Sequence, residues 1–358
     1  MNVLVLHTML DPSATDDQAD VLVQAAAVEE ALRTLGHSST RAALPADPED
    51  AAELVRAPGV DAVFNLVESI GGDDSLAWIV PEILEDAGVA FTGCTSAATA
   101  HTLDKLAAKR TLLRAGLPTP RWLDPLGAEG TPNAARAPLP GTFILKSATA
   151  HASVGIDDAA VVAVPDSASL RAAIRDRRAA TGLDDIFAES YIDGREFNIS
   201  LLSADPRPGG DSPPQVLAPA EIVFKEYASA KPHIVGYDAK WKAGSFEYEH
   251  TPRRFDFPAS DEPLLETLRE LSRRCWGLFG LSGYARVDFR VDTRGAPFIL
   301  EINTNPCLSP DAGFAAALAA SGIRFDQAVA RLLAEALARQ TARGGDLPGP
   351  SPPGLRSW

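Results

Sequence analysis

The sequence has few cysteines, no long apolar run and no excess of positive charge, and each absence excludes a class of protein. Its three cysteines, Cys94, Cys275 and Cys307, lack the spacing of a metal-binding motif and cannot all pair as disulfides. No stretch approaches the roughly 18–20 consecutive apolar residues of a membrane-spanning helix. The apolar run near the N-terminus is short and has no basic segment before it, so it does not resemble a signal peptide. We therefore expect a cytoplasmic protein that does not act at a membrane.

The charge balance and the missing motifs narrow the function further. A formal net charge of −15 argues against a nucleic-acid-binding surface, because nucleic acids attract clustered lysine and arginine. There is no Walker A motif, and no histidine stands in a recognisable setting with a nucleophilic serine or cysteine. The composition is that of an ordinary globular protein, with 46% hydrophobic and 23% charged residues. A length of 358 residues indicates two or three packed domains.

The N-terminal quarter of the chain predicts an open α/β sheet. Residues 21–35 have apolar side chains at helical spacing and are followed by Gly36, a common residue just after a helix. Such an alternation of strands and helices places the ligand crevice beyond the C-terminal ends of the strands. Three apolar runs are typical of the buried strands: residues 2–7, 60–66 and 89–92.

The most informative stretch is residues 283–307, which predicts a β-hairpin around a Thr-Arg-Gly turn. Side chains two positions apart in a strand share a face, so Arg286 lies with Asp288, and Glu301 with Asn303. Two carboxylates and an amide beside an arginine are suited to Mg²⁺ and to the phosphates that accompany it. The alternative is an edge hairpin with a solvated polar face.

Four other residues are candidates for contacts with a nucleotide, each with a simpler alternative. Lys146 ends an apolar run before a loop of small residues, where it could contact a phosphate or be an ordinary exposed lysine. Glu189 and Glu196 flank an Asp-Gly turn signal, so they could accept hydrogen bonds from adenine and ribose across a hairpin, or be solvated turn charges. Lys240 lies in a long polar segment that could close over a triphosphate, although an exposed lysine is the simpler interpretation.

Together, several segments resemble one family, the ATP-grasp ligases, and most closely the D-alanine–D-alanine ligases. The resemblance extends from about residue 63 to residue 337, with the segments in the family's order and at believable spacing. It rests on five segments: TLDKLAAKRTLLRAGLPTP, FILKSATAHASVG, AESYIDGREF, YDAKW and RVDF followed by LEINTNP. It implies an α/β, three-domain ATP-grasp fold with ATP and Mg²⁺ or Mn²⁺, two ions in all, as cofactors. The implied domains are an N-terminal open α/β sheet (1–94), a central lid domain (95–190) and a C-terminal ATP-grasp domain (191–340), followed by a disordered tail (341–358).

The resemblance also assigns roles to individual residues. Those matching the family's ATP-binding positions are Lys105, Lys146, Ser153, Val154, Gly155, Glu189, Tyr191, Ile192, Glu196, Lys240 and Leu300. Those matching the metal ligands are Asp288, Glu301 and Asn303. Arg286 and Lys240 match catalytic residues that offset charge on the transferring phosphoryl group, and the backbone N–H of Cys307 would complete an oxyanion hole. The implied chemistry is formation of an amide bond between a carboxylate and an amine through an acyl phosphate.

The departures from the family pattern concern the substrates. The family's first loop usually carries a glutamate that holds an amino group, and here Asp16 or Asp17 could replace it; in the second loop Glu68 replaces a histidine. Trp241 replaces a tyrosine. Where the family has a serine that binds the second substrate's carboxylate, this chain has Asp311 nearby, which would repel a carboxylate. We therefore expect small-molecule amino acid or amine substrates other than D-alanine.

Two further interpretations stay open at this point. The chain could be a true D-alanine–D-alanine ligase with an unusual pocket, or a degenerate ATP-grasp protein that binds nucleotide for regulation. The complete set of lysines, arginine, carboxylates and asparagine matching the nucleotide and metal positions argues against the second of these. The resemblance also implies a homodimer formed through the first domain.

Overall fold

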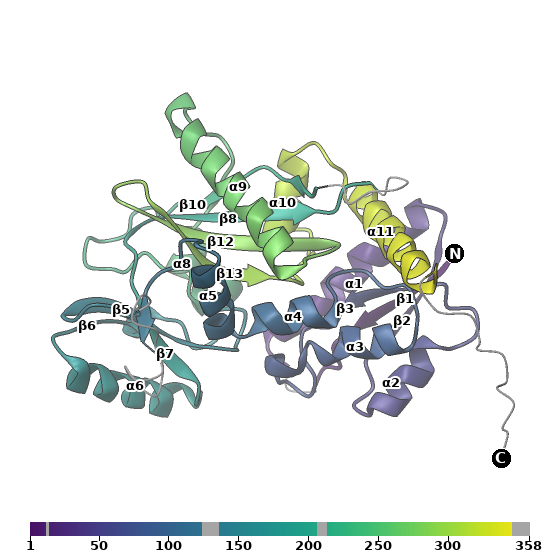
Figure 1. Ribbon diagram of the computed structural model, residues 1–358, viewed down its shortest axis with the longest axis horizontal. Helices are drawn as coiled ribbons and strands as arrows, with labels where there is room; N and C mark the ends of the chain where they lie inside the picture. Colours follow the sequence, from purple (N-terminus) through teal and green to yellow (C-terminus); the bar gives the residue numbers. More distant parts are fainter. Residues whose placement is uncertain (12–13, 124–135, 206–212, 346–358) are drawn as a thin grey trace, which may run out of the picture.

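The computed structural model describes residues 1–11, 14–123, 136–205 and 213–345, in which three β-sheets are flanked by helices (Figure 1). The sheets take their strands from residues 2–66, 122–190 and 194–303 in turn. The expected α/β class is therefore confirmed. The domain boundaries at residues 94 and 190 stay predictions. No helix in the described ranges is long and apolar enough to cross a membrane.

The first sheet is parallel, with strand order β2-β1-β3. Its strands are β1 (Asn2–His7), β2 (Ser38–Ala43) and β3 (Ala62–Leu66), and the helices between and after them are α1 (Asp16–Thr34), α2 (Pro48–Val55) and α3 (Ile79–Asp86). The central strand β1 and the edge strand β3 are almost wholly buried, as their apolar runs predict. The strand predicted at residues 89–92 is wrong, because Phe91 forms only an isolated bridge to Val63. The third strand is β2, whose small and polar side chains are exposed or partly exposed.

The second sheet is antiparallel, with strand order β4-β7-β5-β6, and α6 (Ser167–Thr181) covers it. Its strands are β4 (Trp122–Leu123), β5 (Gly141–Ser147), β6 (Val161–Val164) and β7 (Ile186–Ser190). The apolar side chains of α6, among them Leu170 and Ile174, pack with Phe143 and Leu145 of β5. The loop after β5 therefore begins at a firmly packed strand.

The third sheet has six antiparallel strands, in the order β11-β10-β8-β12-β13, with β9 beside β8. They are β8 (Gly194–Leu202), β9 (Gln215–Val216), β10 (Ala220–Ile222), β11 (Arg253–Arg254), β12 (Tyr284–Asp292) and β13 (Pro297–Asn303). The predicted hairpin is β12–β13, as expected. The other predicted hairpin is wrong, since β7 and β8 belong to different sheets.

Helices cover one face of the third sheet and leave the other free for polar residues. Apolar residues of α9, such as Leu268 and Cys275, pack with Val287 and Phe289 of β12. This cluster includes residues of α4 and α5, which pass between the first and second sheets (Figure 1). The helices are α4 (Ser96–Leu103), α5 (Lys105–Arg114) and α9 (Glu262–Phe279), and the short helices are η1 (Asp74–Leu76), η3 (Asp158–Ala160), η4 (Ala259–Asp261), α7 (Tyr237–Trp241) and α8 (Phe246–Glu249).

The C-terminal helices return to the first sheet. α10 (Gly313–Ala320), which the sequence did not predict, and α11 (Phe325–Gly345) pack with α1 in one core cluster. Because α11 continues to Gly345, the tail predicted from residue 341 is wrong for its first five positions. Residues 346–358, the rest of that predicted tail, lie outside the described part of the chain.

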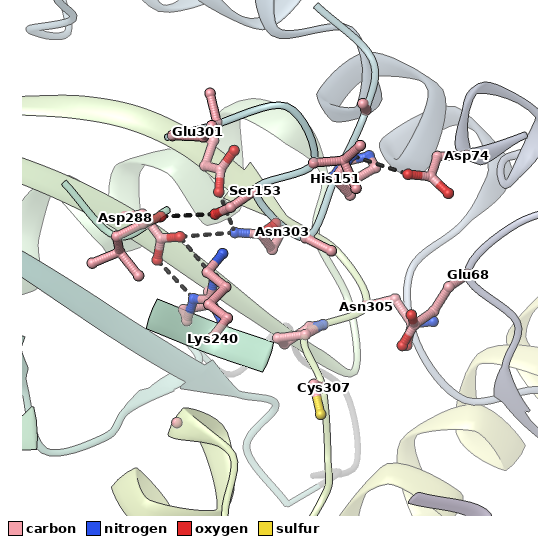
Figure 2. A pocket seen from close by; sticks show the side chains of 18 of the residues that line it. Glu68, Asp74, His151, Ser153, Lys240, Asp288, Glu301, Asn303, Asn305 and Cys307 are labelled. Atoms are coloured by element: carbon pink, nitrogen blue, oxygen red, sulfur yellow. Dashed lines mark hydrogen bonds and ion pairs between the residues drawn. The ribbon is translucent and has the colours of Figure 1, made fainter. Parts of the chain in front are cut away.

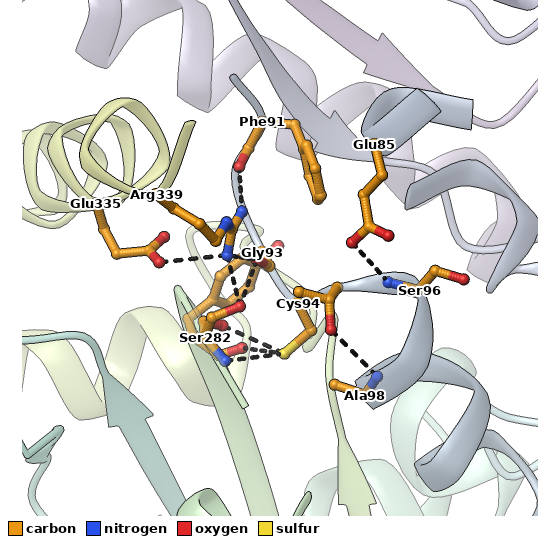
Figure 3. A network of polar contacts seen from close by, with 11 residues as sticks. Glu85, Phe91, Gly93, Cys94, Ser96, Ala98, Ser282, Glu335 and Arg339 are labelled. Carbon is orange, nitrogen blue, oxygen red and sulfur yellow. Dashed lines mark hydrogen bonds and ion pairs between the residues drawn. The ribbon is translucent and has the colours of Figure 1, made fainter. Parts of the chain in front are cut away.

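Arg339 of α11 joins the segment between α3 and α4 to the start of β12 (Figure 3). Its guanidinium donates hydrogen bonds to the carbonyls of Phe91 (2.6 Å) and Gly93 (2.9 Å) and to Ser282 Oγ (2.6 Å). At Gly283, where φ is +66°, a Cβ would lie 2.8 Å from the backbone nitrogen of Gly93, so only glycine fits this close approach. This contact fixes the first sheet relative to the third, and the candidate site lies between them.

Candidate active site

A cavity of about 1110 Å³ lies where the loops of all three sheets meet, and nearly all the residues singled out from the sequence line it. Figure 2 shows its polar centre, with Asp288, Glu301 and Asn303 together and Cys307 further along the loop that leaves β13. The exceptions are Asp16 and Asp17, whose side chains lie outside the described part of the chain, and Gly155, which supports the loop that lines the cavity.

The polar centre is built by strand register. Arg286 stands opposite Asn303, and Asp288 opposite Glu301, so the two polar pairs share one face of the sheet as predicted. A β-bulge follows Asp288. Asn303 Nδ2 donates to Asp288 Oδ2 (3.1 Å) and contacts Glu301 Oε1 (3.5 Å).

Each carboxylate at this centre faces positively charged side chains. Arg286 donates two hydrogen bonds to Asp288, Nε to Oδ1 (2.7 Å) and Nη2 to Oδ2 (2.8 Å). Burial would raise the pKa of Glu301, but Lys105, Lys240 and Lys146 outweigh it and hold that pKa well below its usual range. Glu301 is therefore a carboxylate that faces three cations.

These residues suit a divalent cation by their chemistry. Asp288 and Glu301 offer carboxylate oxygens and Asn303 an amide oxygen, all hard donors of the kind that Mg²⁺ prefers. No cluster of three or more His, Cys, Asp or Glu side chains suited to a metal occurs in the described ranges. A cation here would therefore rely on two carboxylates, the amide and the oxygens of a bound nucleotide.

The lysines expected to contact phosphates are held by neighbouring groups. Lys105 Nζ donates to the carbonyl of Ala150 (2.7 Å), and Lys146 Nζ donates to Glu189 Oε1 (2.7 Å). Glu189, only 1% exposed, also pairs with Lys109, and the two lysines outweigh burial and lower the pKa of Glu189. Sequence reasoning missed Lys109, although its place one helical turn after Lys105 could have indicated it.

The loop that follows β5 is held closed over the cavity by contacts from several elements. The backbone N–H of His151 donates to Asp74 Oδ2 (3.0 Å), Trp241 Nε1 donates to the Ala152 carbonyl (3.1 Å), and Ser153 Oγ donates to the Val235 carbonyl (2.9 Å). Burial, Lys105 and Lys240 lower the pKa of His151 to about 4, so its imidazole is neutral near pH 7.

The conformation of this loop also depends on its backbone. Ala152 and Ser153 both have positive φ, 56° and 62°, which is uncommon without glycine. Gly155 has φ +69°, and a Cβ there would lie 2.8 Å from Leu183 Cδ1, while its carbonyl accepts a hydrogen bond from Arg177 (2.6 Å). Val154 is exposed and lines the cavity.

Tyr191, Ile192, Glu196 and Leu300, which the resemblance assigns to adenine and ribose, all line the cavity. Sequence reasoning missed Arg290, which is 4% exposed and stands opposite Glu196 in the register of β12 and β8. Its Nη1 contacts Glu196 Oε2 (3.1 Å), and its Nε donates to the Ile192 carbonyl (2.9 Å). Burial raises the pKa of Glu196, against the effect of Arg290.

The other end of the cavity is joined to the first sheet through α1. Asp20 accepts hydrogen bonds from Cys307 Sγ (3.0 Å) and Ser309 Oγ (2.7 Å), while Gln24 bridges Glu68 Oε1 (3.0 Å) and the backbone N–H of Leu308 (2.9 Å). Burial and Asp20 raise the pKa of Cys307, so its thiol stays protonated. Asp20 and Gln24 were missed because no spacing within α1 indicates a partner so far along the chain.

Trp241 and Asp311, which we expected to contact a substrate, make other contacts in the structure. Trp241 lines the cavity, but its indole N–H is used to hold the loop after β5. Asp311 is exposed at the cavity wall, and its backbone carbonyl accepts a hydrogen bond from Arg253 Nη1 (2.8 Å). Arg253, from β11, is a further cavity residue that the sequence did not indicate.

Comparisons with known proteins relate the chain to one family and one fold. Residues 129–334 match the family described as D-ala D-ala ligase C-terminus. The chain is 31% identical to the D-alanine–D-alanine ligase of Synechococcus sp. strain JA-3-3Ab over 344 residues, covering 92% of this chain and 94% of that protein. It is also 31% identical to the D-alanine–D-alanine ligase of Stutzerimonas stutzeri over 291 residues, covering 81% and 82%. The fold is similar to that of the ATP-complexed D-alanine–D-alanine ligase from Bacillus anthracis, with a TM-score of 0.70, 18% identity, and coverage of 96% and 100%.

Proposed function

Because the chain belongs to the D-alanine–D-alanine ligase family, whose members are ATP-dependent C–N ligases, we propose that it joins two molecules of D-alanine. The observation that carries the proposal is the meeting of Lys105, Lys240 and Arg286 with Asp288 and Glu301 at one point of the cavity. Such an arrangement stabilises charge that moves between phosphate oxygens, and positioning of this kind supplies most of the rate in phosphoryl transfer.

The proposed reaction has two steps. The carboxylate of the first D-alanine attacks the γ-phosphorus of ATP, and ADP leaves as an acyl phosphate forms. The amine of the second D-alanine attacks the acyl carbon, loses a proton, and expels inorganic phosphate as the amide forms. Lys105 and Lys240 would offset charge on the transferred phosphoryl group, and the backbone N–H of Cys307 would face the oxyanion of the second step.

The cofactors follow from the same groups. We propose that Asp288, Glu301 and Asn303 hold Mg²⁺ or Mn²⁺, two ions when nucleotide is bound, which neutralise charge on the phosphates. Tyr191, Ile192 and Leu300 would surround the adenine, and Glu196 would accept hydrogen bonds from the ribose. The loop containing Ser153 and Val154 would exclude water, because an acyl phosphate hydrolyses readily.

Our expectation about the identity of the substrates changes. The sequence led us to expect substrates other than D-alanine, mainly because of Asp311. The relatives with assigned activities do not support that departure, and their names favour D-alanine at both positions. The expected repulsion between Asp311 and a substrate carboxylate is also weaker, because Arg253 brings a positive charge beside Asp311. No observation favours a regulatory protein without turnover.

A substrate panel tests the proposal. Phosphate release with Mg-ATP would be measured for all pairs of D- and L-amino acids and for common diamines, with the products identified by mass spectrometry. We expect release with D-alanine alone and D-alanyl-D-alanine as the product. The Glu301→Gln variant controls for contaminating ATPases. Product from another pair, with none from D-alanine, would refute the assignment of substrate while keeping the ligase chemistry. We also propose a homodimer, which light scattering tests.

A further inference from the structure

Arg253 extends into the part of the cavity that lies beside the loop of residues 307–312. The side chain is exposed, and only one of its hydrogen bonds is defined, from Nη1 to the Asp311 carbonyl. A Cβ on Gly313 would lie 3.3 Å from Arg253 Nε, so the guanidinium lies close against the start of α10. Part of the Arg253 guanidinium, with its N–H donors, therefore faces the cavity.

The other arginines and most of the lysines in the cavity have defined partners. Arg286 is bonded to Asp288, and Arg290 to Glu196. Lys146 is bonded to Glu189, and Lys105 to a loop carbonyl. Lys240 faces Glu301, at the polar centre. Among the described residues of the cavity, Arg253 is therefore the arginine that bonds no carboxylate and is accessible to a ligand.

The adjoining loop of residues 307–312 offers no free side-chain donor, because its thiol and hydroxyl are already hydrogen-bonded. Ser309, which is 1% exposed, gives its hydroxyl to Asp20, and Cys307 gives its thiol to the same carboxylate. Gln24 takes the backbone N–H of Leu308. Ala312, at the start of α10, has no polar side chain. These hydrogen bonds hold the loop in place beside Arg253, whose guanidinium could supply charged donors to a carboxylate bound there.

We propose that Arg253 binds the carboxylate of the acceptor amino acid, an inference that rests on the proposed function. A guanidinium binds a carboxylate through two parallel hydrogen bonds, which fix orientation as well as position. The contact would orient the acceptor, and it would select amino acids over amides and diamines. Arg253 would also offset the repulsion between Asp311 and the acceptor carboxylate.

The test compares free acids with their amides. Wild-type protein, Arg253→Gln and Arg253→Lys would be assayed by amide formation with each amino acid of the panel as acceptor, and with the matching amino acid amide, beginning with D-alanine and D-alaninamide. We expect Arg253→Gln to raise the acceptor KM for the free acid about 10- to 100-fold, the effect of losing a charged hydrogen bond. The KM for the amide should change less than about twofold, and Arg253→Lys should recover part of the loss.

The controls separate this inference from the proposed function. Arg274→Gln removes an exposed arginine from α9, outside the cavity, and should leave both KM values unchanged. Equal use of acids and amides by wild-type protein, or equal losses for both in Arg253→Gln, would overturn the role of Arg253. If wild-type protein uses an acceptor other than D-alanine, the proposed function fails, but the preference for acid over amide still tests Arg253.

Discussion

Replacing Arg290 with methionine tests the nucleotide end of the cavity. The change keeps an unbranched apolar stem but removes the guanidinium and its two hydrogen bonds, one to Glu196 (3.1 Å) and one to the Ile192 carbonyl (2.9 Å). A hydrogen bond to a charged group contributes about 1.5–3 kcal/mol. If Glu196 holds the ribose, loss of its partner should raise the KM for ATP about tenfold or more.

The same variant should acquire a pH dependence. Burial already raises the pKa of Glu196, while Arg290 and Lys240 act against that rise. Without Arg290 the pKa must rise further, so protonated Glu196 accumulates as the pH falls. A protonated carboxyl group has lost part of its capacity to accept hydrogen bonds from ribose. The KM for ATP should therefore increase from pH 8 to pH 6 more steeply in the variant than in wild-type protein.

The assay is phosphate release at saturating amino acid, with ATP varied at pH 6, 7 and 8. Arg294→Met is the matched control, because Arg294 is exposed in the turn of the same hairpin. Breaking a buried ion pair also destabilises a fold, by about 3 kcal/mol or more, so a melting curve accompanies each variant. An ATP KM within twofold of wild type at all three pH values would refute the assignment of Glu196 and Arg290 to the nucleotide.

Three further predictions concern other parts of the site. Glu301→Gln should lower kcat by roughly 100-fold or more, because it removes a charge at the polar centre, while ATP binding measured by calorimetry persists; unchanged turnover would exclude Glu301 from the chemistry. Lys109→Met should destabilise the fold by about 3 kcal/mol, measured by denaturant unfolding, because Glu189 stays buried with one lysine instead of two; an unchanged midpoint would contradict this. Asp20→Asn should raise the amino acid KM about fivefold and leave the ATP KM unchanged, because the loop at Cys307 loses a charged acceptor; equal changes in both would point to general damage.

The polar centre could be predicted because its pattern is local. Arg286 and Asp288 interrupt an apolar strand at the spacing of a single face, and Glu301 and Asn303 repeat that spacing after a short turn. Because every second side chain of a strand points to the same face, the two polar pairs must either converge on one face or point into solvent. The structure places them together, although nothing in the hairpin alone required the third sheet around it.

The incorrect hairpin shows how a local signal can mislead. Asp193 and Gly194 are typical of a tight turn, and the glycine is needed, but for another reason. Gly194 has φ +140°, and a Cβ there would lie 2.1 Å from the Val291 carbonyl of β12. The glycine permits close pairing of β8 with β12. The chain therefore leaves the second sheet after β7 and enters the third sheet at this glycine.

The substrate end could not be predicted because its contacts join distant parts of the chain. Asp20 bonds Cys307, 287 positions away, and Arg253 bonds the Asp311 carbonyl from a strand of only two residues. No periodicity within α1 or β11 indicates these partners. The resemblance did not indicate them either, since it placed the expected acid at Asp16 or Asp17 and gave Arg253 no role.

Trp241 connects the loop after β5 with the segment that carries Lys240, and this link makes a prediction about coupling. Trp241→Phe keeps an aromatic ring but removes the N–H that donates to Ala152 (3.1 Å). A neutral hydrogen bond contributes about 1 kcal/mol, so the population with an open loop should rise about fivefold. Water would then reach the acyl phosphate more often, and phosphate would be released without amide formation. The measurement is the ratio of phosphate to dipeptide, with Trp276→Phe on α9 as control. A ratio that stays at one in Trp241→Phe would mean that this hydrogen bond does not keep the loop closed during turnover.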